Sequence, residues 1–419
     1  MTIERIEIPV LIIGAGPAGA GTSIYLTLAG IHHIIIDKET FPRDKVCGDA
    51  CSGKTAFVIR RAHPEWIEEI LKDQQTFLPS HGIIFAAPNG KQLRIQYNPN
   101  KLPGDPAPGF TLPRFIFDNF LFQKLVSPFT TIYQGATLKS IERLPDAKIK
   151  VIFVKDSTVY EVITPLIVGA DGDKSYVRKT LMNDNISSRS HAVGLRAYYE
   201  GVTGLDKDDF LELHFLPELL PGYFWIFPLP DGKVNVGVGI LSDKIRNERI
   251  NLREKMLAAI KNNPNVKDRF ANALLIDKIQ GWGLPMGMEQ LPVSGDNFLL
   301  TGDAASLIDP FSGEGIGNAL YSGMLAAYAI ERSINENRFD KAFLKEHYDA
   351  VLYKRIGEEL KISKTLQRLC RFPWLFNFIV NKAIKSPSLS KTISSMFLDL
   401  DLREQLRKPS FYFKILMNK

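Results

Sequence analysis

A glycine-rich turn near the N-terminus constrains the fold of this chain more than any other feature. In IEIPVLIIGAGPAGAGTSIYLTLAGIHHIIIDKE (residues 6–39) an apolar run ends in glycines, helical spacing of apolar residues follows, and a second apolar run ends in an acid. This order predicts a βαβ unit. Gly14, Gly16 and Gly19 form G-x-G-x-x-G, in which the first glycine permits the tight turn, the second lets backbone approach a pyrophosphate, and the third allows close helix packing. The sequence therefore predicts that this unit binds a dinucleotide.

The N-terminus of the predicted helix is the expected site of the pyrophosphate, because free N–H groups and the helix dipole favour an anion there. Asp37 ends the second strand, where its carboxylate is suited to a ribose hydroxyl. His32 and His33, at the turn before that strand, are expected at the surface and are given no role. The predicted cofactor contacts in this unit are Gly14, Gly16, Pro17, Ala18, Gly19, Asp37 and Lys38.

Two distant stretches indicate which dinucleotide is bound. FLLTGDAASLIDPFSGEGIGNAL (298–320) and PLIVGADGDKSYVRKTL (165–181) each run from an apolar strand into a glycine- and aspartate-bearing loop. Together with the βαβ unit of residues 6–39, these two stretches resemble the FAD-containing oxidoreductases of the glutathione-reductase-like Rossmann type. That type includes aromatic hydroxylases and geranylgeranyl reductases. The resemblance implies that the cofactor is FAD, and that Asp303 holds ribityl or ribose hydroxyls. It also implies that the backbone N–H groups of Gly315 and Ile316 face the flavin, where they stabilise its reduced, negatively charged form.

Shorter matches extend the resemblance. LPRFIFDNFLFQKL (112–125) resembles the family's R-x-x-F-D-x-x-L helix, which implies that Arg114 reaches the FAD phosphate or ribityl region; a solvated helix arginine is the alternative. Ala136 falls where the family's adenine-contacting strand lies, and an ordinary core position is equally open. The further cofactor contacts that the resemblance implies are Arg43, Cys47, Gly48, Arg114, Ala136, Asp171, Gly302, Asp303, Pro310, Gly313, Gly315 and Ile316.

The stretch PGYFWIFPLPDGKVNVGVG (221–239) concentrates aromatic residues in one predicted strand. Strand alternation places Tyr223, Trp225 and Phe227 on one face of a sheet, and Phe224 and Ile226 on the other. The stretch looks like the Y-x-W-x-F-P…G-x-G signature of the geranylgeranyl reductase family. That likeness implies a substrate pocket lined by the first three rings, because uncharged aromatic faces suit a long apolar substrate. Ordinary core packing is the alternative.

A cysteine loop supports the same resemblance. PRDKVCGDACSG (42–53) resembles the family's R-x-K-x-C-G loop near the flavin, with Asp49 where a glycine is common and with a second cysteine, Cys51. Cys47 is the tentative catalytic residue, as a proton donor or as part of the pocket wall, and a small buried apolar residue is the alternative. Cys47 and Cys51 have no other likely ligand nearby in sequence, so a metal site is rejected.

The predicted fold is α/β. With 419 residues and 45% hydrophobic content the chain can form two or three domains, and disordered and fibrous classes are excluded. We expect a discontinuous Rossmann-type FAD-binding domain, an inserted, mostly antiparallel β-sheet substrate domain, and a C-terminal helical region. The expected boundaries are 1–75, 106–185 and 290–335 for the first, 76–105 and 186–289 for the second, and 336–419 for the third.

The resemblance implies an FAD-dependent oxidoreductase that reduces carbon–carbon double bonds of a geranylgeranyl-type chain by hydride transfer from reduced flavin. The external reductant, NADPH or a ferredoxin, stays open. The main alternative is an NAD(P)H-dependent FAD monooxygenase acting on an apolar or aromatic substrate, because Gly169-Ala170-Asp171-Gly172 with Ser175 and Arg178 is shared with the hydroxylases. A flavin halogenase is less favoured. A flavoprotein without its own substrate would lack a closed apolar pocket.

Charge is concentrated near the C-terminus. The chain carries +6 overall, but residues 361–419 carry +9 and the rest about −3. Residues 361–398 hold seven Lys or Arg, no acid and many apolar residues. This segment is suited to an anionic membrane surface, and the alternative is a solvated basic face whose apolar side packs on the FAD domain.

Three cysteines and the lack of a signal or spanning segment lead us to expect a cytoplasmic protein, with peripheral membrane contact left open. No motif for nucleic acid is present, so that partner is not expected.

Overall fold

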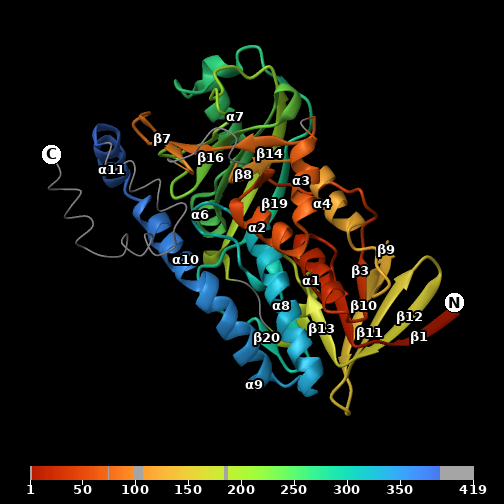
Figure 1. Cartoon of the computed structure of the whole chain (residues 1–419). Coiled ribbons are helices and arrows are strands. Elements are labelled where there is room, and N and C mark those ends of the chain that lie inside the picture. The colour runs from red at the N-terminus through yellow and green to blue at the C-terminus, as the bar shows by residue number, and fades with distance from the viewer. Residues whose placement is uncertain (1, 74, 99–106, 184–186, 387–419) are drawn as a thin grey trace.

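The computed structural model of the protein describes residues 2–73, 75–98, 107–183 and 187–386. A parallel sheet forms its lower half in Figure 1 and an antiparallel sheet its upper half. The lower sheet runs in the order β20-β21-β13-β2-β3-β9 and is parallel except for the pairing of β20 with β21. Its strands are β2 (Val10–Ile13), β3 (His33–Asp37), β9 (Thr130–Gln134), β13 (Leu166–Gly169), β20 (Ser294–Gly295) and β21 (Phe298–Leu300). The central strands β2 and β13 are apolar and fully buried, as expected of a parallel sheet covered on both faces.

The predicted βαβ unit is present as β2, α1 (Pro17–Leu28) and β3. Gly14 has φ +103°, a conformation that L side chains rarely adopt. A Cβ on Gly19 would lie 1.8 Å from the Gly14 carbonyl oxygen, so only glycine allows the helix to begin this close to the turn. Helix α1 packs along α8 (Ile316–Glu336), and the two lie side by side in Figure 1.

His33 is buried, so its predicted surface position is wrong. Its Nε2 lies 2.7 Å from the Ser23 hydroxyl and its Nδ1 lies 2.8 Å from the Ile31 carbonyl oxygen. Burial lowers the pKa of His33 to about 4, which keeps the ring neutral inside the sheet. The neighbouring His32 contacts the Phe129 ring, with centroids 5.1 Å apart.

A second sheet completes the lower half. It runs in the order β1-β12-β11-β10, and its apolar residues share one core with the parallel sheet. Its strands are β1 (Thr2–Glu7), β10 (Thr137–Arg143), β11 (Ile149–Lys155) and β12 (Thr158–Thr164). The smaller elements are α2 (Gly53–Ala62), α3 (Pro64–Lys72), α4 (Arg114–Gln123), α5 (Tyr176–Met182), and the small sheet of β4 (Ala50–Cys51), β5 (Leu78–Ser80) and β8 (Gly109–Thr111).

The upper sheet runs in the order β18-β14-β17-β16-β15-β6-β7, with β19 also paired to β14. It is antiparallel except where β15 pairs with β6. Its strands are β6 (Gly82–Ala86), β7 (Gln92–Gln96), β14 (His191–Glu200), β15 (Leu211–His214), β16 (Tyr223–Pro228), β17 (Lys233–Leu241), β18 (Leu274–Leu275) and β19 (Gln280–Pro285). The sheet therefore combines two strands that precede α4 in the sequence, β6 and β7, with strands that follow α5.

The two faces of the upper sheet differ as the alternation in β16 predicts. Phe224 and Ile226 belong to a core that includes residues of α7 (Leu252–Asn262), whereas Trp225 and Phe227 belong to the core on the opposite face. The short helix α6 (Ser242–Glu248) follows β17. The ring face of β16 is thus separate from the face that α7 covers.

The C-terminal helices are α9 (Lys341–Leu344), α10 (Ala350–Leu369) and α11 (Pro373–Lys385). Helix α10 runs along one side of the molecule from the lower half toward α11, which lies beside the upper sheet (Figure 1). Val380 and Ala383 of α11 are buried in the same core as the ring face of β16. The alternative that the apolar side of this segment packs on the FAD domain is therefore wrong for α11. Residues 387–398 of the predicted basic segment lie outside the described residues.

The α/β fold with a Rossmann-type unit, further sheets and a C-terminal helical region is confirmed. No helix in the described ranges has the length and apolar character needed to cross a membrane.

Candidate active site

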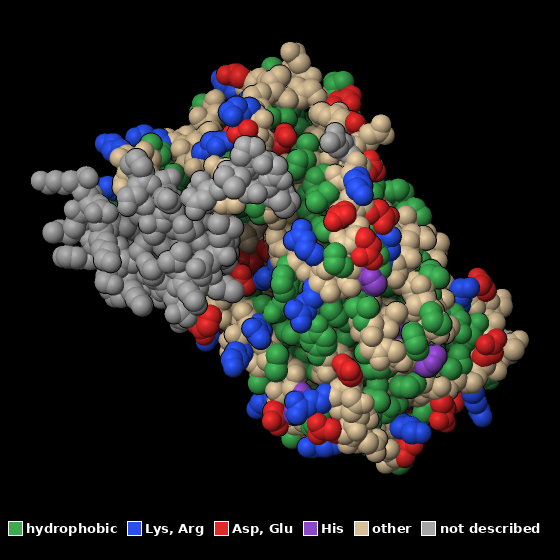
Figure 2. Space-filling model, viewed as in Figure 1, with side chains coloured by type: hydrophobic (Ala, Val, Ile, Leu, Met, Phe, Trp, Pro, Cys, Tyr) green, Lys and Arg blue, Asp and Glu red, His purple; other side chains and the backbone are tan. Residues whose placement is uncertain are grey.

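One cavity of about 1490 Å³ extends from the glycine turn of β2 to the C-terminal helices. Cavities that hold one small ligand have roughly 300–1,000 Å³, so this volume has room for a dinucleotide and a second molecule. Figure 2 shows a hollow beside the grey segment, with charged side chains at its edge. The cavity joins the lower sheet, the upper sheet and α10 in a single site.

Most of the predicted site residues line this cavity. Those brought together are Gly14, Gly16, Pro17, Ala18, Asp37, Lys38, Arg43, Cys47, Gly48, Arg114, Ala136, Asp171, Asp303, Gly313, Gly315 and Ile316, with Tyr223, Trp225 and Phe227. Three predicted residues are not on its wall. Gly19 packs on Gly14, Gly302 packs on Ala18 and Ala319, and Pro310 lies between two residues that do line the cavity.

Hydrogen bonds preorganise the dinucleotide end. Asp37 Oδ2 accepts a hydrogen bond of 2.7 Å from the Ala15 N–H, which fixes the glycine turn to the end of β3. Burial raises the pKa of Asp37, and the N–H groups of Glu39 and Ala15 oppose that shift. The carboxylate of Asp171 accepts from Ser175 Oγ and from the N–H groups of Tyr176 and Val177, so its oxygens hold the start of α5.

We expect Gly16→Ala to give a folded protein that binds FAD at least tenfold more weakly. A Cβ at this position would meet no atom of the chain closer than Arg43 Nη2 at 3.5 Å, so the substitution fits the protein but occupies the predicted pyrophosphate approach. A tenfold loss corresponds to about 1.4 kcal/mol. Titration of the apoprotein with FAD measures the affinity, and a melting curve without FAD shows whether the variant is folded as stably as the unchanged protein.

The matched variant Gly19→Ala should instead lower the stability of the apoprotein, because its Cβ clashes with the Gly14 backbone. Equal FAD affinity in Gly16→Ala and the unchanged protein would contradict the assigned pyrophosphate position.

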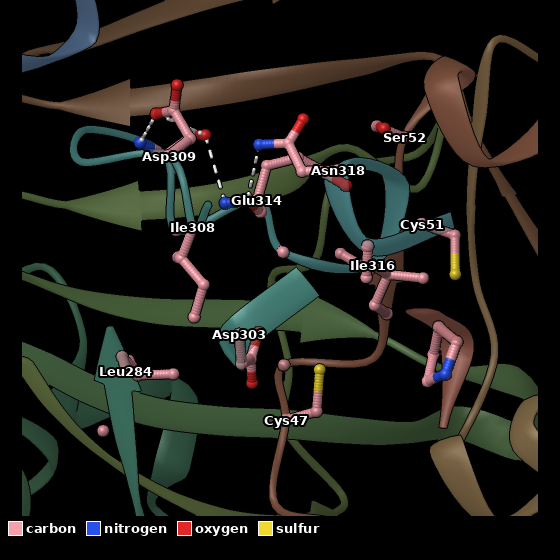
Figure 3. Close-up of a pocket in the computed structure, with 18 of the residues that line it drawn as sticks. Cys47, Cys51, Ser52, Leu284, Asp303, Ile308, Asp309, Glu314, Ile316 and Asn318 are labelled. Carbon is pink, nitrogen blue, oxygen red and sulfur yellow. Dashed lines mark hydrogen bonds between the residues drawn. The ribbon is translucent and has the colours of Figure 1, made fainter. Parts of the chain in front are cut away.

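The loop before α8 forms the middle of the cavity (Figure 3). Asp309 Oδ1 accepts from the N–H groups of Phe311 and Ser312, and the Asp309 N–H donates to the Glu314 carbonyl oxygen at 2.9 Å. This closed loop places Gly315 and Ile316 at the N-terminus of α8, a helix of 21 residues. Free N–H groups and the helix dipole there favour negative charge on a bound ring.

The three rings of β16 form a continuous wall above this loop. Adjacent ring centroids are 6.1 Å apart from Tyr223 to Trp225 and again from Trp225 to Phe227. The Tyr223 hydroxyl donates to the Ser312 carbonyl oxygen at 2.6 Å, which ties the wall to the loop. Phe227 packs against Gly48, where a Cβ would lie 3.0 Å from the ring. The wall therefore spans from the α8 loop to the cysteine loop.

Beyond the ring wall the cavity is apolar. It continues under the upper sheet and ends against the C-terminal helices. Its apolar lining comes from β6, β7, β15, the α8 loop, α10 and α11: Ile83, Phe85, Leu93, Ile95, Leu211, Leu213, Phe311, Ile362, Leu366, Leu369, Phe376, Ile379 and Val380. An environment of this kind favours a long hydrocarbon chain.

Cys47 lies on the cavity wall next to a buried cation. Burial raises the pKa of its thiol, and the Arg114 guanidinium opposes that shift. The net effect keeps the thiol protonated at neutral pH, because its pKa stays above the ordinary value. Cys51 also lines the cavity and is buried.

Arg114 is held inside the protein, so the alternative of a solvated helix arginine is wrong. Its side chain is 3% exposed and makes two hydrogen bonds, of 2.6 and 2.7 Å, to the two carboxylate oxygens of Asp118. Arg43 donates to the same carboxylate at 2.6 Å. The predicted contact of Arg114 with FAD stays a prediction.

A buried polar network supports the wall from behind, and the sequence analysis missed it. Asn235 Oδ1 accepts from Trp225 Nε1 at 2.9 Å, while its Nδ2 donates to the Cys47 carbonyl oxygen and to Asp49. Asp49 also accepts from the Tyr198 hydroxyl. Burial raises the pKa of Asp49 to about 6, although these donors oppose the shift. An asparagine inside the apolar strand VNVGVG was the available signal.

Comparison with known proteins agrees with this geometry. The family described as FAD binding domain matches residues 7–341. Menaquinone reductase of Mycobacterium tuberculosis is 28% identical over 369 residues, covering 87% of this chain and 84% of its own. Digeranylgeranylglycerophospholipid reductase of Methanococcus vannielii is 27% identical over 366 residues, covering 86% and 87%.

Solved structures share the fold. A geranylgeranyl bacteriochlorophyll reductase-like protein from Thermoplasma acidophilum has a TM-score of 0.78 at 20% identity, over 90% of this chain and 91% of the other. A halogenase in complex with FAD has a TM-score of 0.71 at 17% identity, over 96% and 82%. The glycine turn, the closed loop before α8 and the match over most of the chain place this protein in the FAD-binding-domain family, as an FAD-dependent oxidoreductase.

Proposed function

We propose that the protein reduces carbon–carbon double bonds of a polyprenyl lipid or other isoprenoid chain. The observation that carries the proposal is that the cofactor end of the cavity continues, past the ring wall of β16, into an apolar space. The reductase names of the relatives support the same substrate class. A flavoprotein without its own substrate would not need this space.

The chemistry requires a hydride at one alkene carbon and a proton at the other. Bound FAD, once reduced by an external donor such as NADPH or a ferredoxin, supplies the hydride. The proton has a source in Cys47, whose half-buried thiol stays protonated at neutral pH and lines the cavity. Two electrons and two hydrogens therefore enter the double bond, and the cysteine regains its proton from solvent.

An isolated alkene is not polarised by a neighbouring carbonyl, so its position matters more than acid–base assistance. Tyr223, Trp225 and Phe227 supply a rigid apolar surface, fixed to Ser312 at one end and to Asn235 near its centre. Two of these rings are only 8% exposed, which excludes water from the reacting end of the chain.

A monooxygenase is the second candidate. The loop from Gly169 to Gly172, with Ser175 and Arg178, is shared with aromatic hydroxylases, and a halogenase has the same fold. The two functions differ in oxygen demand. A hydroxylase consumes oxygen and adds an oxygen atom to its product, whereas the proposed reductase does neither.

Part of the C-terminal segment is suited to peripheral contact with an anionic membrane. Around the start of α11, Phe372 is 51% exposed and Trp374 is 69% exposed, and Arg371 is beside them. Ile384 near the helix end is 47% exposed and is followed by Lys385. Aromatic and basic side chains in this combination favour a lipid interface, where a prenyl lipid is found.

The test of the proposed function is anaerobic turnover. The protein is reconstituted with FAD, reduced with dithionite and given geranylgeraniol in neutral detergent micelles. We expect products heavier by two hydrogens for each reduced double bond. An oxygenated product formed with stoichiometric oxygen uptake, and no reduction without oxygen, would favour the hydroxylase instead.

A further inference from the structure

Cys47 needs a new proton after each reduced double bond, and the cavity side does not supply it while substrate is bound. The residue lies on the cavity wall (Figure 3), where a bound hydrocarbon chain excludes water. The proton that Cys47 gives to the alkene is therefore replaced from behind the wall, through the protein. Such a route requires groups that exchange protons and that extend from the thiol toward solvent.

Asp49 is the carboxyl that the cysteine loop itself brings to the thiol. It stands two residues after Cys47, where the family's loop commonly has a glycine, and its φ is +62°, a conformation that favours glycine. Burial raises the pKa of the Cys47 thiol, the Asp49 charge adds to that shift, and a hydrogen bond from the Asp49 N–H opposes it. The chain thus keeps a buried carboxyl beside the thiol at a position where glycine suits the backbone better.

Three donors hold the Asp49 carboxyl in place. Its Oδ2 accepts from the Tyr198 hydroxyl at 2.7 Å and from Asn235 Nδ2 at 2.8 Å, and its Oδ1 accepts from the Arg114 N–H at 3.1 Å. Asn235 Nδ2 also donates to the Cys47 carbonyl oxygen at 2.7 Å. Burial raises the pKa of Asp49 to about 6, and the three donors oppose the shift. A carboxyl with a pKa this close to neutrality takes up and releases a proton readily at physiological pH.

Tyr198 extends this network outward. Its side chain is partly exposed, whereas Asp49 is fully buried. Burial raises the pKa of Tyr198, so its hydroxyl stays protonated and donates to Asp49. The Arg196 guanidinium lies 4.1 Å from the centre of the Tyr198 ring. It pairs with Asp44 and Asp277, whose side chains are 40% and 33% exposed, so the Tyr198 ring lies between the buried carboxyl and the solvent-exposed ones.

The other charged neighbours of the thiol are less suited to carry a proton. Arg114 keeps its guanidinium protonated at all relevant pH values. Lys45 Nζ donates to Asp303 at 3.1 Å, and Asp303 is a predicted contact of FAD. The hydrogen bonds among the described residues therefore favour a route through Asp49 and Tyr198.

We propose that Asp49 and Tyr198 return a proton from solvent to Cys47 after each reduced double bond. This inference rests on the proposed function, in which Cys47 gives its proton to the alkene. As Tyr198 gives its hydroxyl proton to Asp49, its oxygen takes a proton from the solvent, and Asp49 passes its own proton to the thiolate. One proton leaves the solvent and one arrives at the sulfur, so Asp49 and Tyr198 end in the states in which they began.

The experiment separates the first turnover from later ones, because the first uses the proton already on Cys47. FAD-loaded full-length protein is reduced with dithionite and mixed anaerobically with geranylgeraniol in neutral detergent micelles, first with limiting substrate and no excess reductant, then with both in excess. We expect Tyr198→Phe and Asp49→Gly to keep the single-turnover rate within about threefold and to lose about tenfold or more in steady-state kcat. The double variant should lose no more than either single variant, because the two groups act in series.

Tyr199→Phe is the matched control for Tyr198→Phe. Tyr199 is the next residue of β14, and its ring packs against Phe270 in the core on the opposite face of the sheet, with centroids 5.4 Å apart. This variant should keep both rates. The rate at which dithionite reduces bound FAD, followed by flavin absorption, is measured for every variant so that slow reduction of the cofactor is recognised.

Alkylation of Cys47 tests its contact with Asp49 without turnover. Iodoacetamide reacts with the thiolate, and mass spectrometry of the peptide gives the extent of reaction at Cys47 at each pH. Asp49→Gly removes a negative charge beside the thiol, so half-maximal alkylation should occur at lower pH than in the unchanged protein. An unchanged curve would show that the carboxyl does not act on the thiol, and the relay would be overturned.

The kinetic outcomes distinguish the relay from the proposed function. If Tyr198→Phe slows the first turnover as much as later ones, Tyr198 supports the first transfer or the structure, and the relay is overturned. Unchanged steady-state turnover in either variant, or an equal loss in Tyr199→Phe, overturns it as well, while prenyl reduction stands. If the unchanged protein reduces no prenyl chain, the proposed function fails and the relay fails with it.

Discussion

Replacing Cys47 with alanine should lower kcat for double-bond reduction by about 10² to 10⁴-fold while FAD stays bound. The expected loss is the usual contribution of a positioned general acid. Alanine removes the thiol, which is the group of residue 47 that carries a transferable proton. The substitution changes the side-chain volume on the cavity wall only slightly. Anaerobic single-turnover rates, together with the flavin absorption spectrum, measure the chemistry and the cofactor separately.

The pH profile gives a readout that a packing role for Cys47 would not change. Burial raises the pKa of the thiol, so the protonated form is present at and above neutral pH and is lost only above the range where an ordinary thiol titrates. The rate of the unchanged protein should fall at that high pH, and the rate of Cys47→Ala should not. A single-turnover rate within threefold of the unchanged protein would contradict the assignment.

Cys51→Ala is the matched control for Cys47→Ala. Cys51 is four residues away and lines the same cavity, so the two variants share the substitution and the cavity, although Cys51 is buried and Cys47 is half-buried. Burial raises the pKa of Cys51 also, and well above the ordinary value. We expect Cys51→Ala to affect stability more than rate, because its side chain belongs to the main core of the lower half.

Features fixed by local sequence were predicted well. The order of strand, glycine turn, helix and strand in residues 6–39 depends on contacts between near neighbours, so the βαβ unit could be read directly. The same is true of β16, whose alternation separates Trp225 from Phe224 because successive residues of a strand face opposite ways.

Features that depend on tertiary packing were not predicted. His33 follows a turn in sequence, but its strand becomes central when β9 pairs with β3, and its ring is then enclosed. The C-terminal helices carry no motif, and only the fold brings α10 and α11 to the cavity. The pairing of Asn235 with Trp225 and the cysteine loop joins residues up to 188 positions apart.

The Arg114–Asp118 pair gives the second large expected effect. Asp118→Asn should lower the free energy of unfolding by about 3–5 kcal/mol, because it leaves the buried Arg114 and the neighbouring Arg43 without their counter-charge. Urea unfolding of the apoprotein at neutral pH measures this loss without a contribution from FAD.

The exposed pair Arg332–Glu336 on α8 is the control for that measurement. It has the same i, i+4 spacing, but its side chains are 59% and 42% exposed, so Glu336→Gln should cost less than about 0.5 kcal/mol. A difference of less than about 1 kcal/mol between Asp118→Asn and Glu336→Gln would show that the buried pair is not a major contributor to stability.

The pH dependence of the same variants identifies the charge as the cause. Burial alone would raise the pKa of Asp118, but Arg114 and Arg43 outweigh it and hold the pKa below its ordinary value. A carboxyl whose pKa is depressed in the folded state stabilises the protein above its unfolded pKa of about 3.9, and that contribution is lost as the pH falls toward the folded pKa. The stability of the unchanged protein should therefore decline more steeply below about pH 4 than that of Asp118→Asn, and the two curves should converge in acid. Parallel curves would mean that the amide disrupts packing, because a packing defect does not depend on the protonation of residue 118.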